Sequence, residues 1–523
     1  MHHDDPPMKS SRSLDYELST VVSSASRSSP LKPHSNSFST SQISFHLQFP
    51  QSLLILTHLH LIRRVLKSSL KLNRSDILHP LLDLKQDLIP FFQKVGYVSH
   101  HFFESSLLAV KVFFQSHTFH VVSKDLPRLF SLASFFRTEV QSVFLHVTKT
   151  FNAEDFPSIS TLITGLSFYP ETNNDLEFLN KSSSFFPRLK QLNVRVDTCI
   201  YMAMIDLLKD NTSVTSLNLS YNSIGVEGAR ALAEALKVNT TLRSINLREN
   251  CIGAEGARAL ANALKVNATI TNVNLAWNSI RDEGVKSLAD VLKVNTSITQ
   301  IDLEGNSIDD EGVIAFAGAM KVNSTVTRID LLDNYIEKDG AIALAEALKF
   351  NYTVTRIRLG DTFIGDEGAI ALAELLKVNS TVTRIDLWKS HIGNEGAIAL
   401  AETLKCNSTI TWIDVGANSI GYDGAIALAA ALKVNSTVTN IILGWNSIGT
   451  EGANALAESL TVNSTVTQIH LSSNSIGNEG AIALAEALKV NSIVTKIKLY
   501  GNSIDSDTTQ LISDNRFSFN LHG

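Results

Sequence analysis

Residues 323–350, NSTVTRIDLLDNYIEKDGAIALAEALKF, decide the fold of this chain. Residues 326–331 alternate apolar and polar side chains and include β-branched residues, a pattern typical of a short strand with one buried face. We expect Ile329 and Leu331 to point into the core, and Arg328 and Asp330 to lie on the other face. Residues 340–349 form a helix-prone segment whose apolar residues recur at i, i+3, i+4 and i+7. The stretch therefore predicts one strand followed by one helix, with a buried stripe formed by Ala341, Leu344, Ala345 and Leu348.

This unit recurs every 28 residues, and an asparagine marks each recurrence. The marker residues are Asn211, Asn239, Asn267, Asn295, Asn323, Asn351, Asn379, Asn407, Asn435, Asn463 and Asn491. A period of this length is typical of a solenoid, in which each unit buries its apolar face against its neighbours. A second asparagine follows most strands, as Asn334 does here, and is expected to satisfy backbone groups of the turn. The many Asn-x-Ser/Thr triplets are interpreted as part of the repeat and not as glycan sites.

The strand, the helix and the L-x-L-x-x-N pattern between them resemble the ribonuclease-inhibitor class of leucine-rich repeats. The same class forms the repeat region of NOD-like receptors, although this chain lacks their GxxxxGK[ST] nucleotide-binding motif. The resemblance covers residues 214–504. It implies an α/β solenoid shaped like a horseshoe, with parallel strands inside and helices outside.

Composition and pattern divide the chain into five segments. We predict a disordered tail rich in serine and proline, a mostly helical region, three degenerate repeats, the regular 28-residue repeats, and a C-terminal tail or cap. The degenerate repeats are centred on residues 140–145, 163–168 and 189–194. In the same order, the five segments are residues 1–45, 46–125, 126–205, 206–506 and 507–523.

Part of the helical region resembles an F-box. Residues 76–103 contain a leucine pair at Leu81 and Leu82, an Asp-Leu at Asp87, and a Val-Ser-x-x-aromatic ending that begins at Val98. The usual Leu-Pro opening of the motif is missing. The resemblance implies docking to a ubiquitin-ligase adaptor, and the alternative is a helical cap for the solenoid.

The bulk composition excludes several classes of function. The net charge of −6 and the 18% of charged residues give no basic bias toward nucleic acid or an anionic membrane. No secretory signal is recognised near Met1, and residues 52–66 are too short and too often interrupted to span a membrane, so we expect a cytoplasmic protein. Three scattered cysteines, Cys199, Cys251 and Cys406, are expected to fill small buried positions. No catalytic, metal-binding or cofactor-binding motif occurs, so we predict neither enzyme activity nor a cofactor.

The candidate binding site follows from the variable positions of the strands. Side chains that alternate away from the core line the inner wall of the predicted horseshoe and differ between repeats, so binding specificity must lie there. In two middle repeats Thr362 and Ser390 replace the turn asparagine, where arginine and tryptophan also gather. Arginine and tryptophan are enriched in binding hot spots. The predicted protein-binding residues are Arg328, Asp330, Arg356, Arg358, Asp361, Arg384, Asp386, Trp388, Lys389, Trp412 and Asp414.

The charges of this region are balanced, which favours a protein or peptide partner over nucleic acid. Our leading hypothesis is therefore a non-enzymatic scaffold that binds a protein or peptide on the concave face. The alternative is an F-box-type substrate receptor of a cullin ubiquitin ligase. A third hypothesis is a regulator of a small GTPase. The remaining alternative is that the predicted protein-binding residues vary through repeat drift and bind no partner.

Overall fold

The computed structural model describes the backbone of residues 119–122, 143–147, 163–168, 189–194, 205, 208–209, 211–513 and 519–520. Side chains are described for residues 189–194, 205, 208–209 and 211–511. The chain divides into two compact units, residues 1–67 and 68–523, and every described residue belongs to the second. The predicted tail at residues 1–45 and the F-box-like segment at residues 76–103 lie outside the described residues.

Within the second unit, one parallel sheet of 16 strands follows the order of the chain, and each strand pairs with the next. The middle strands pair at a constant offset, so that Ile329 of β9 lies opposite Ile357 of β10. The strands are β1 (Phe119–Val122), β2 (Val143–Val147), β3 (Ile163–Phe168), β4 (Gln191–Val194), β5 (Ser216–Asn218), β6 (Ser244–Asn246), β7 (Asn272–Asn274), β8 (Gln300–Asp302), β9 (Arg328–Asp330), β10 (Arg356–Arg358), β11 (Arg384–Asp386), β12 (Trp412–Asp414), β13 (Asn440–Ile442), β14 (Gln468–His470), β15 (Lys496–Lys498) and β16 (Phe519–Asn520).

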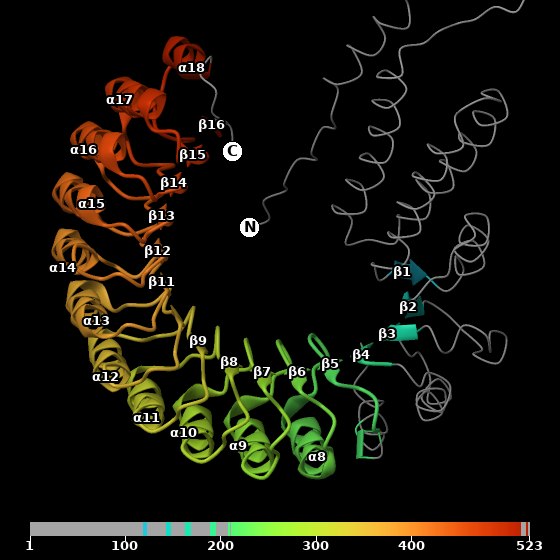
Figure 1. Cartoon of the computed structure of the whole chain (residues 1–523). Helices are drawn as coiled ribbons and strands as arrows, with labels where there is room; N and C mark the ends of the chain where they lie inside the picture. Colours follow the sequence, from blue (N-terminus) through green and yellow to red (C-terminus); the bar gives the residue numbers. More distant parts are fainter. Residues whose placement is uncertain are drawn as a thin grey trace, which may run out of the picture. The chain divides into compact units, whose positions relative to one another are not determined.

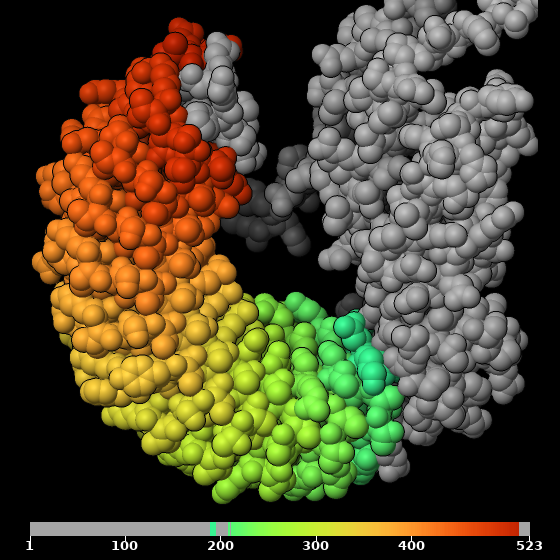
Figure 2. All heavy atoms as spheres, viewed as in Figure 1, coloured from blue at the N-terminus to red at the C-terminus, as the bar shows by residue number. Residues whose placement is uncertain are grey.

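A helix follows each strand from β5 to β15. Figure 1 shows these helices along the outer side of a curved array and the strands along its inner side, and Figure 2 shows successive repeats packed as one continuous body. The helices are α8 (Gly225–Val238), α9 (Gly253–Leu264), α10 (Arg281–Leu292), α11 (Asp310–Met320), α12 (Lys338–Leu348), α13 (Gly365–Val378), α14 (Asn394–Leu404), α15 (Tyr422–Val434), α16 (Gly449–Val462), α17 (Gly477–Val490) and α18 (Ser506–Ser513).

The core lies between the sheet and the helices. Ile329 and Leu331 are fully buried, as their alternation in the sequence predicts, and so are the four residues of the predicted helical stripe. Glycine in the first turn lets adjacent helices approach closely. A Cβ on Gly256 would come within 2.6 Å of Ile252 and 2.9 Å of Ala229 in the preceding helix. The fold is thus the predicted α/β leucine-rich-repeat solenoid, with parallel strands inside and helices outside.

Two columns of buried asparagines connect the repeats. The marker residue Asn323 donates from Nδ2 to the Leu292 carbonyl at 2.8 Å and accepts from the backbone N–H of Val326 at 2.8 Å. In the second column, Asn278 donates to the Leu247 carbonyl at 2.8 Å and accepts from the Asn250 N–H at 3.0 Å. Each amide therefore satisfies buried backbone groups of two repeats, which explains the strict period.

The degenerate repeats and the C-terminal segment also add strands. β2, β3 and β4 overlap the three strands predicted at residues 140–145, 163–168 and 189–194. β1 lies inside the segment 46–125, for which the sequence predicts helices, and it pairs with β2. At the other end, α18 and β16 extend the array into the predicted tail or cap, with β16 paired to β15.

The prediction that the cysteines are buried is wrong for the two that the structure describes. Cys251 and Cys406 are both exposed. Cys251 lies in a strand-exit turn, at the position that serine occupies in most other repeats. Cys406 follows α14 at the position where other repeats place an exposed valine, such as Val322. Repeat position, and not the residue type, decides the exposure of these side chains.

Candidate functional site

Two rows of side chains run across strands β8 to β12 on the surface opposite the core. Because successive strand residues face opposite sides, the first and third residues of each strand share the concave surface while the middle isoleucine is buried. The first row consists of the first strand residues, Gln300, Arg328, Arg356, Arg384 and Trp412. The second row consists of the third strand residues, Asp302, Asp330, Arg358, Asp386 and Asp414.

The second row contains a continuous ion-pair network. Arg358 lies between two carboxylates and donates from Nη1 to Asp330 at 2.6 Å and from Nε to Asp386 at 3.3 Å. The same oxygen of Asp330 accepts from Nη2 of Arg328 at 3.1 Å. The Asp330 side chain is fully covered. This network requires strands β9, β10 and β11 to pair in register, because its members lie about 28 residues apart in the chain.

Two carboxyl groups of the second row have strongly raised pKa values. Burial, and then the negative charge of Asp330, raises the pKa of Asp302 to about 6. Burial raises the pKa of Asp414 to about 7, and the charge of Asp386 adds to the shift while the backbone N–H of Gly416 opposes it. In both cases desolvation disfavours the charged form more than nearby donors favour it.

The first row holds three arginines on adjacent strands, and two of them have no ionic partner among the described residues. The Nε atoms of Arg356 and Arg384 are buried without a hydrogen-bond partner. Burial, and then the positive charges of the neighbouring arginines, lowers the pKa of Arg356. The guanidinium of Arg384 stacks 4.8 Å from the ring centre of Trp412, which is a cation–π contact.

The strand exits place further predicted residues beside these rows. Lys389 pairs with Asp361 at 2.8 Å, and its Nζ lies 5.8 Å from the ring centre of Trp388. Asp361 and Lys389 have left-handed backbone conformations, with φ of 53° and 52°. Residues with this conformation recur at strand exits along the array.

In the two substituted turns, hydroxyl groups replace the donor role of the asparagine amide. Thr362 donates from Oγ1 to the Leu359 carbonyl at 2.6 Å, and Ser390 donates from Oγ to the same carbonyl at 3.0 Å. Both side chains are buried. The two hydroxyl groups therefore keep the carbonyl of Leu359 bonded, so it is not free for a ligand.

All eleven predicted site residues lie on strands β9 to β12 or at the exits of β10 and β11. The structure joins Arg328, Asp330, Arg358 and Asp386 in one network, Asp361 with Lys389, and Arg384 with Trp412. Among the charged members, Arg356, Arg384 and Asp414 have no ionic partner in the described part of the chain.

Sequence reasoning missed an aromatic stack formed by the turns that follow β9, β10 and β11. Tyr335, Phe363 and His391 lie in successive repeats, with ring centres 6.5 Å apart for the first pair and 5.1 Å for the second. Tyr335 is 60% exposed and Phe363 is 51% exposed. The signal was present in the sequence, because most other repeats have serine at this position.

Sequence reasoning also missed Glu304, which extends the acidic surface toward the N-terminal repeats. One oxygen each from Asp302, Glu304 and Asp330 lie within 4.8 Å of one another, a spacing that could hold a metal ion. Glu304 also accepts from Nε1 of Trp277 at 2.9 Å and from Arg248 at 3.3 Å. Protein cations and donors therefore already contact this carboxylate group.

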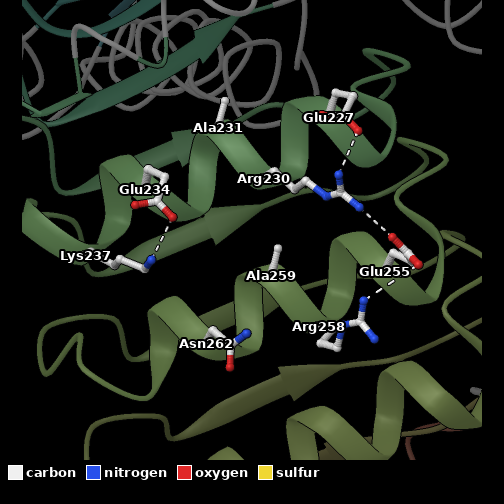
Figure 3. Close-up of a pocket in the computed structure, with 9 residues that line it drawn as sticks. All are labelled: Glu227, Arg230, Ala231, Glu234, Lys237, Glu255, Arg258, Ala259 and Asn262. Atoms are coloured by element: carbon white, nitrogen blue, oxygen red, sulfur yellow. Dashed lines mark hydrogen bonds and ion pairs between the residues drawn. The ribbon is translucent and has the colours of Figure 1, made fainter.

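A hollow of about 450 Å³ lies between the outer faces of α8 and α9. Figure 3 shows that its charged side chains pair with one another. Arg230 contacts Glu227 at 3.0 Å and Glu255 at 2.5 Å, and Lys237 contacts Glu234 at 2.6 Å. These exposed ion pairs leave no unbalanced group directed at a ligand, so the concave surface is the stronger candidate site.

The sequence matches the family model described as "Leucine Rich repeat" in ten segments of 24 residues. The matched residues are 210–233, 238–261, 266–289, 294–317, 322–345, 350–373, 378–401, 406–429, 434–457 and 462–485. The chain thus contains leucine-rich repeats, in agreement with the solenoid described above.

Two solved structures are similar to parts of the chain. An internalin from Listeria monocytogenes strain 4b F2365 is 16% identical, covers 71% of this chain and 89% of its own, and has a TM-score of 0.40. The actin-binding site 2 of leiomodin-1 is 23% identical, covers 29% of this chain and 88% of its own, and has a TM-score of 0.26. No curated protein matches the sequence. Among the described residues, no helix has the length and apolar character needed to cross a membrane.

Proposed function

We propose that this protein is a non-enzymatic scaffold that binds a protein or peptide through the concave surface of strands β8 to β12. One observation carries the proposal: the buried residue of these strands stays isoleucine, while the first row changes from Gln300 through three arginines to Trp412 and the second row places Arg358 among four aspartates. The constant residues are Ile301, Ile329, Ile357, Ile385 and Ile413. Core packing therefore does not explain the variation of the surface rows, which instead supports recognition.

The chemistry of the surface supports a protein partner. It combines half-buried arginines with Trp412 and with Trp388, which is 37% exposed, and such residues dominate protein-binding hot spots. Its second row places Arg358 among four aspartates, so a uniform polyanion would meet repulsion there. The resemblance to the ribonuclease-inhibitor class implies a horseshoe whose inner wall is formed by these strands. A cytoplasmic location remains a prediction from the sequence, and so does the ligase-adaptor site at residues 76–103.

The test uses a double substitution, Arg356→Glu with Trp388→Ala, in the full-length protein. Partners are first identified by proximity labelling in cells, and their affinity is then measured with purified components. We expect the double variant to raise Kd at least about a hundredfold, because two hot-spot residues are lost. The melting temperature should change little, because Arg356 has no ionic partner among the described residues and Trp388 is partly exposed.

The matched control is Arg258→Glu with Tyr422→Ala. These residues lie on α9 and at the start of α15, away from the strand surface, and both are exposed. The control should capture the same partners as the unmodified protein. Equal capture by the concave double variant would refute the proposed surface, and loss of capture by both double variants would show that the effect is not specific to it.

A further inference from the structure

The three arginines of the first row form an incomplete electrostatic site. Arg328, Arg356 and Arg384 occupy equivalent positions on β9, β10 and β11 and pair in register. Neighbouring strands lie about 4.8 Å apart, so the three side chains start side by side on one surface. Guanidinium groups stay charged at all physiological pH values, so this row concentrates positive charge that the side chains cannot lose by titration.

The protein itself neutralises only one end of this row. Arg328 pairs with Asp330, but that carboxylate is shared with Arg358 and bound more closely by it. Among the described residues, no carboxylate pairs with Arg356 or Arg384, and the Nε atoms of both are buried without an acceptor. A buried donor without an acceptor is costly, and native proteins satisfy nearly all of them. The lowered pKa of Arg356 is consistent with this uncompensated charge.

We propose that the Arg328–Arg356–Arg384 row binds a phosphorylated side chain of the protein partner. This inference rests on the proposed function and specifies the chemistry of the partner. A phosphate dianion offers three acceptor oxygens, and arginine binds such groups through two parallel hydrogen bonds. Arg356, at the centre of the row, supplies the principal contact, and Arg384 supplies the second.

The surroundings of the row select a single anionic group over a polyanion. The second row places Asp302, Asp330, Asp386 and Asp414 on the adjacent line of the same surface. A nucleic-acid backbone or an anionic membrane would have to lie across these carboxyl groups as well as the arginines. Continuous basic surfaces are the usual requirement for such ligands. A phosphate on one side chain can contact the first row alone.

Trp412 extends the site at its C-terminal end. Its ring already stacks on the guanidinium of Arg384, and it is half-buried in the row. An aromatic ring at this place can cover the residue next to the phosphate and exclude water from the contact. The fluorescence of Trp412 is also expected to change when an anion binds to Arg384.

The experiment measures binding of three peptide probes to the full-length protein by calorimetry. The probes are drawn from a library of randomised flanks around phosphoserine, the same peptides with serine, and the same peptides with two glutamates. We expect phosphopeptides to bind at least about tenfold more tightly than both comparison sets. Equal or tighter binding of the glutamate peptides would overturn the phosphate assignment in favour of a carboxylate partner. Inorganic phosphate is titrated alone, and an equal Kd for the free ion would overturn recognition of a phosphorylated protein.

Variants localise the contact. Arg356→Gln should raise Kd of the best phosphopeptide at least about tenfold, and Arg356→Lys should give a smaller rise, because lysine keeps the charge but loses the paired donors. Arg258→Gln on the outer helix α9 is the control and should leave Kd unchanged. Arg356→Gln should also leave the melting temperature unchanged or raise it, because it relieves like-charge repulsion. Unchanged phosphopeptide binding in Arg356→Gln would overturn the proposal.

The two proposals fail in distinguishable ways. If the double variant Arg356→Glu with Trp388→Ala loses its cellular partners while no phosphopeptide binds, the concave surface is a binding site but its ligand is not a phosphate. If the double variant keeps its partners, the concave surface itself is rejected, and the phosphate inference is rejected with it.

Discussion

Asp414→Asn should stabilise the protein, and increasingly so as the pH rises. Asp414 lies in the second row on β12 and is only 9% exposed. Its carboxylate accepts the Gly416 N–H at 2.9 Å, but no cation pairs with it among the described residues. Ionisation of Asp414 in the folded protein therefore means charging a desolvated group, which the raised pKa of about 7 expresses.

Asparagine suits this position because the chain already uses it there. Asn218, Asn246 and Asn274 occupy the same place on β5, β6 and β7. Each accepts the backbone N–H two residues further on, at distances of 2.9 to 3.1 Å. The amide oxygen of the variant can accept the Gly416 N–H in the same way. The substitution thus removes the charge with little change in shape or hydrogen bonding.

The size of the effect follows from linkage between protonation and folding. The folded pKa of about 7 lies above the ordinary value of 3.8, so the folded state holds the proton more tightly than the unfolded state. The contribution of Asp414 to the free energy of unfolding is fully present below pH 3.8 and is lost as the pH rises through 7. A shift of about three pKa units corresponds to about 4 kcal/mol. The advantage of the variant should grow from about 0.5 kcal/mol at pH 4 to as much as about 4 kcal/mol at pH 8.

The assay is thermal unfolding followed by circular dichroism at pH 4, 6 and 8, with constant ionic strength. For a large repeat domain, a gain of about 4 kcal/mol corresponds to a rise in melting temperature of about 8 °C. Glu346→Gln on the outer side of α12 serves as the control for removal of one exposed carboxylate and should shift the melting temperature by much less. A variant whose gain is the same at pH 4 and pH 8, or which is less stable at pH 8, would refute the reasoning.

Two further predictions concern the asparagine column and His470, the third residue of β14. Asn278→Leu should lower the free energy of unfolding in urea by at least about 3 kcal/mol, because it leaves the Leu247 carbonyl and the Asn250 N–H buried without partners. The control, Asn262→Leu at an exposed position, should lower it little. Equal losses in the two variants would contradict the role of the asparagine column. Burial, followed by the charges of Lys498 and Lys496, lowers the pKa of His470 to about 4, so the unfolded state takes up the proton first as the pH falls from 6.5. Stability should therefore be lost between pH 6.5 and 4, by about 1 to 2 kcal/mol because solvent screens this half-buried ring, and His470→Gln should flatten the acid side of the plot of melting temperature against pH. An acid limb of unchanged slope in the variant would count against that assignment.

The repeat unit was predictable because its signals are local and periodic. Alternation around Ile329 predicted the strand, and the alanine and leucine stripe from Ala341 predicted the helix, both of which the structure confirms. The spacing of Asn323 and its equivalents predicted the stacking, because each amide bonds to the preceding repeat. Pattern reasoning did not extend to β1, whose pairing with β2 is visible only in three dimensions.

The candidate surface was predictable as a set of positions but not as an arrangement of charges. The sequence showed five positive and, with Asp333 of the same region included, five negative residues, and predicted a balanced surface. In the structure the charges are not all paired. Arg358 forms ion pairs with both Asp330 and Asp386, whereas no carboxylate among the described residues pairs with Arg356. A count of charged residues cannot distinguish a guanidinium that is paired with a carboxylate from one that is not.

The sequence by itself determined which apolar strand and helix residues of each unit are buried, which face of each strand is free, and how often the unit repeats. These properties depend on hydrophobic periodicity and on backbone hydrogen bonds that every unit makes in the same way. Only the tertiary structure decided which side chains of different repeats meet, how much water they lose, and therefore which charges remain uncompensated. Electrostatic energies depend steeply on distance and solvation, and register across strands sets both for residues far apart in the chain.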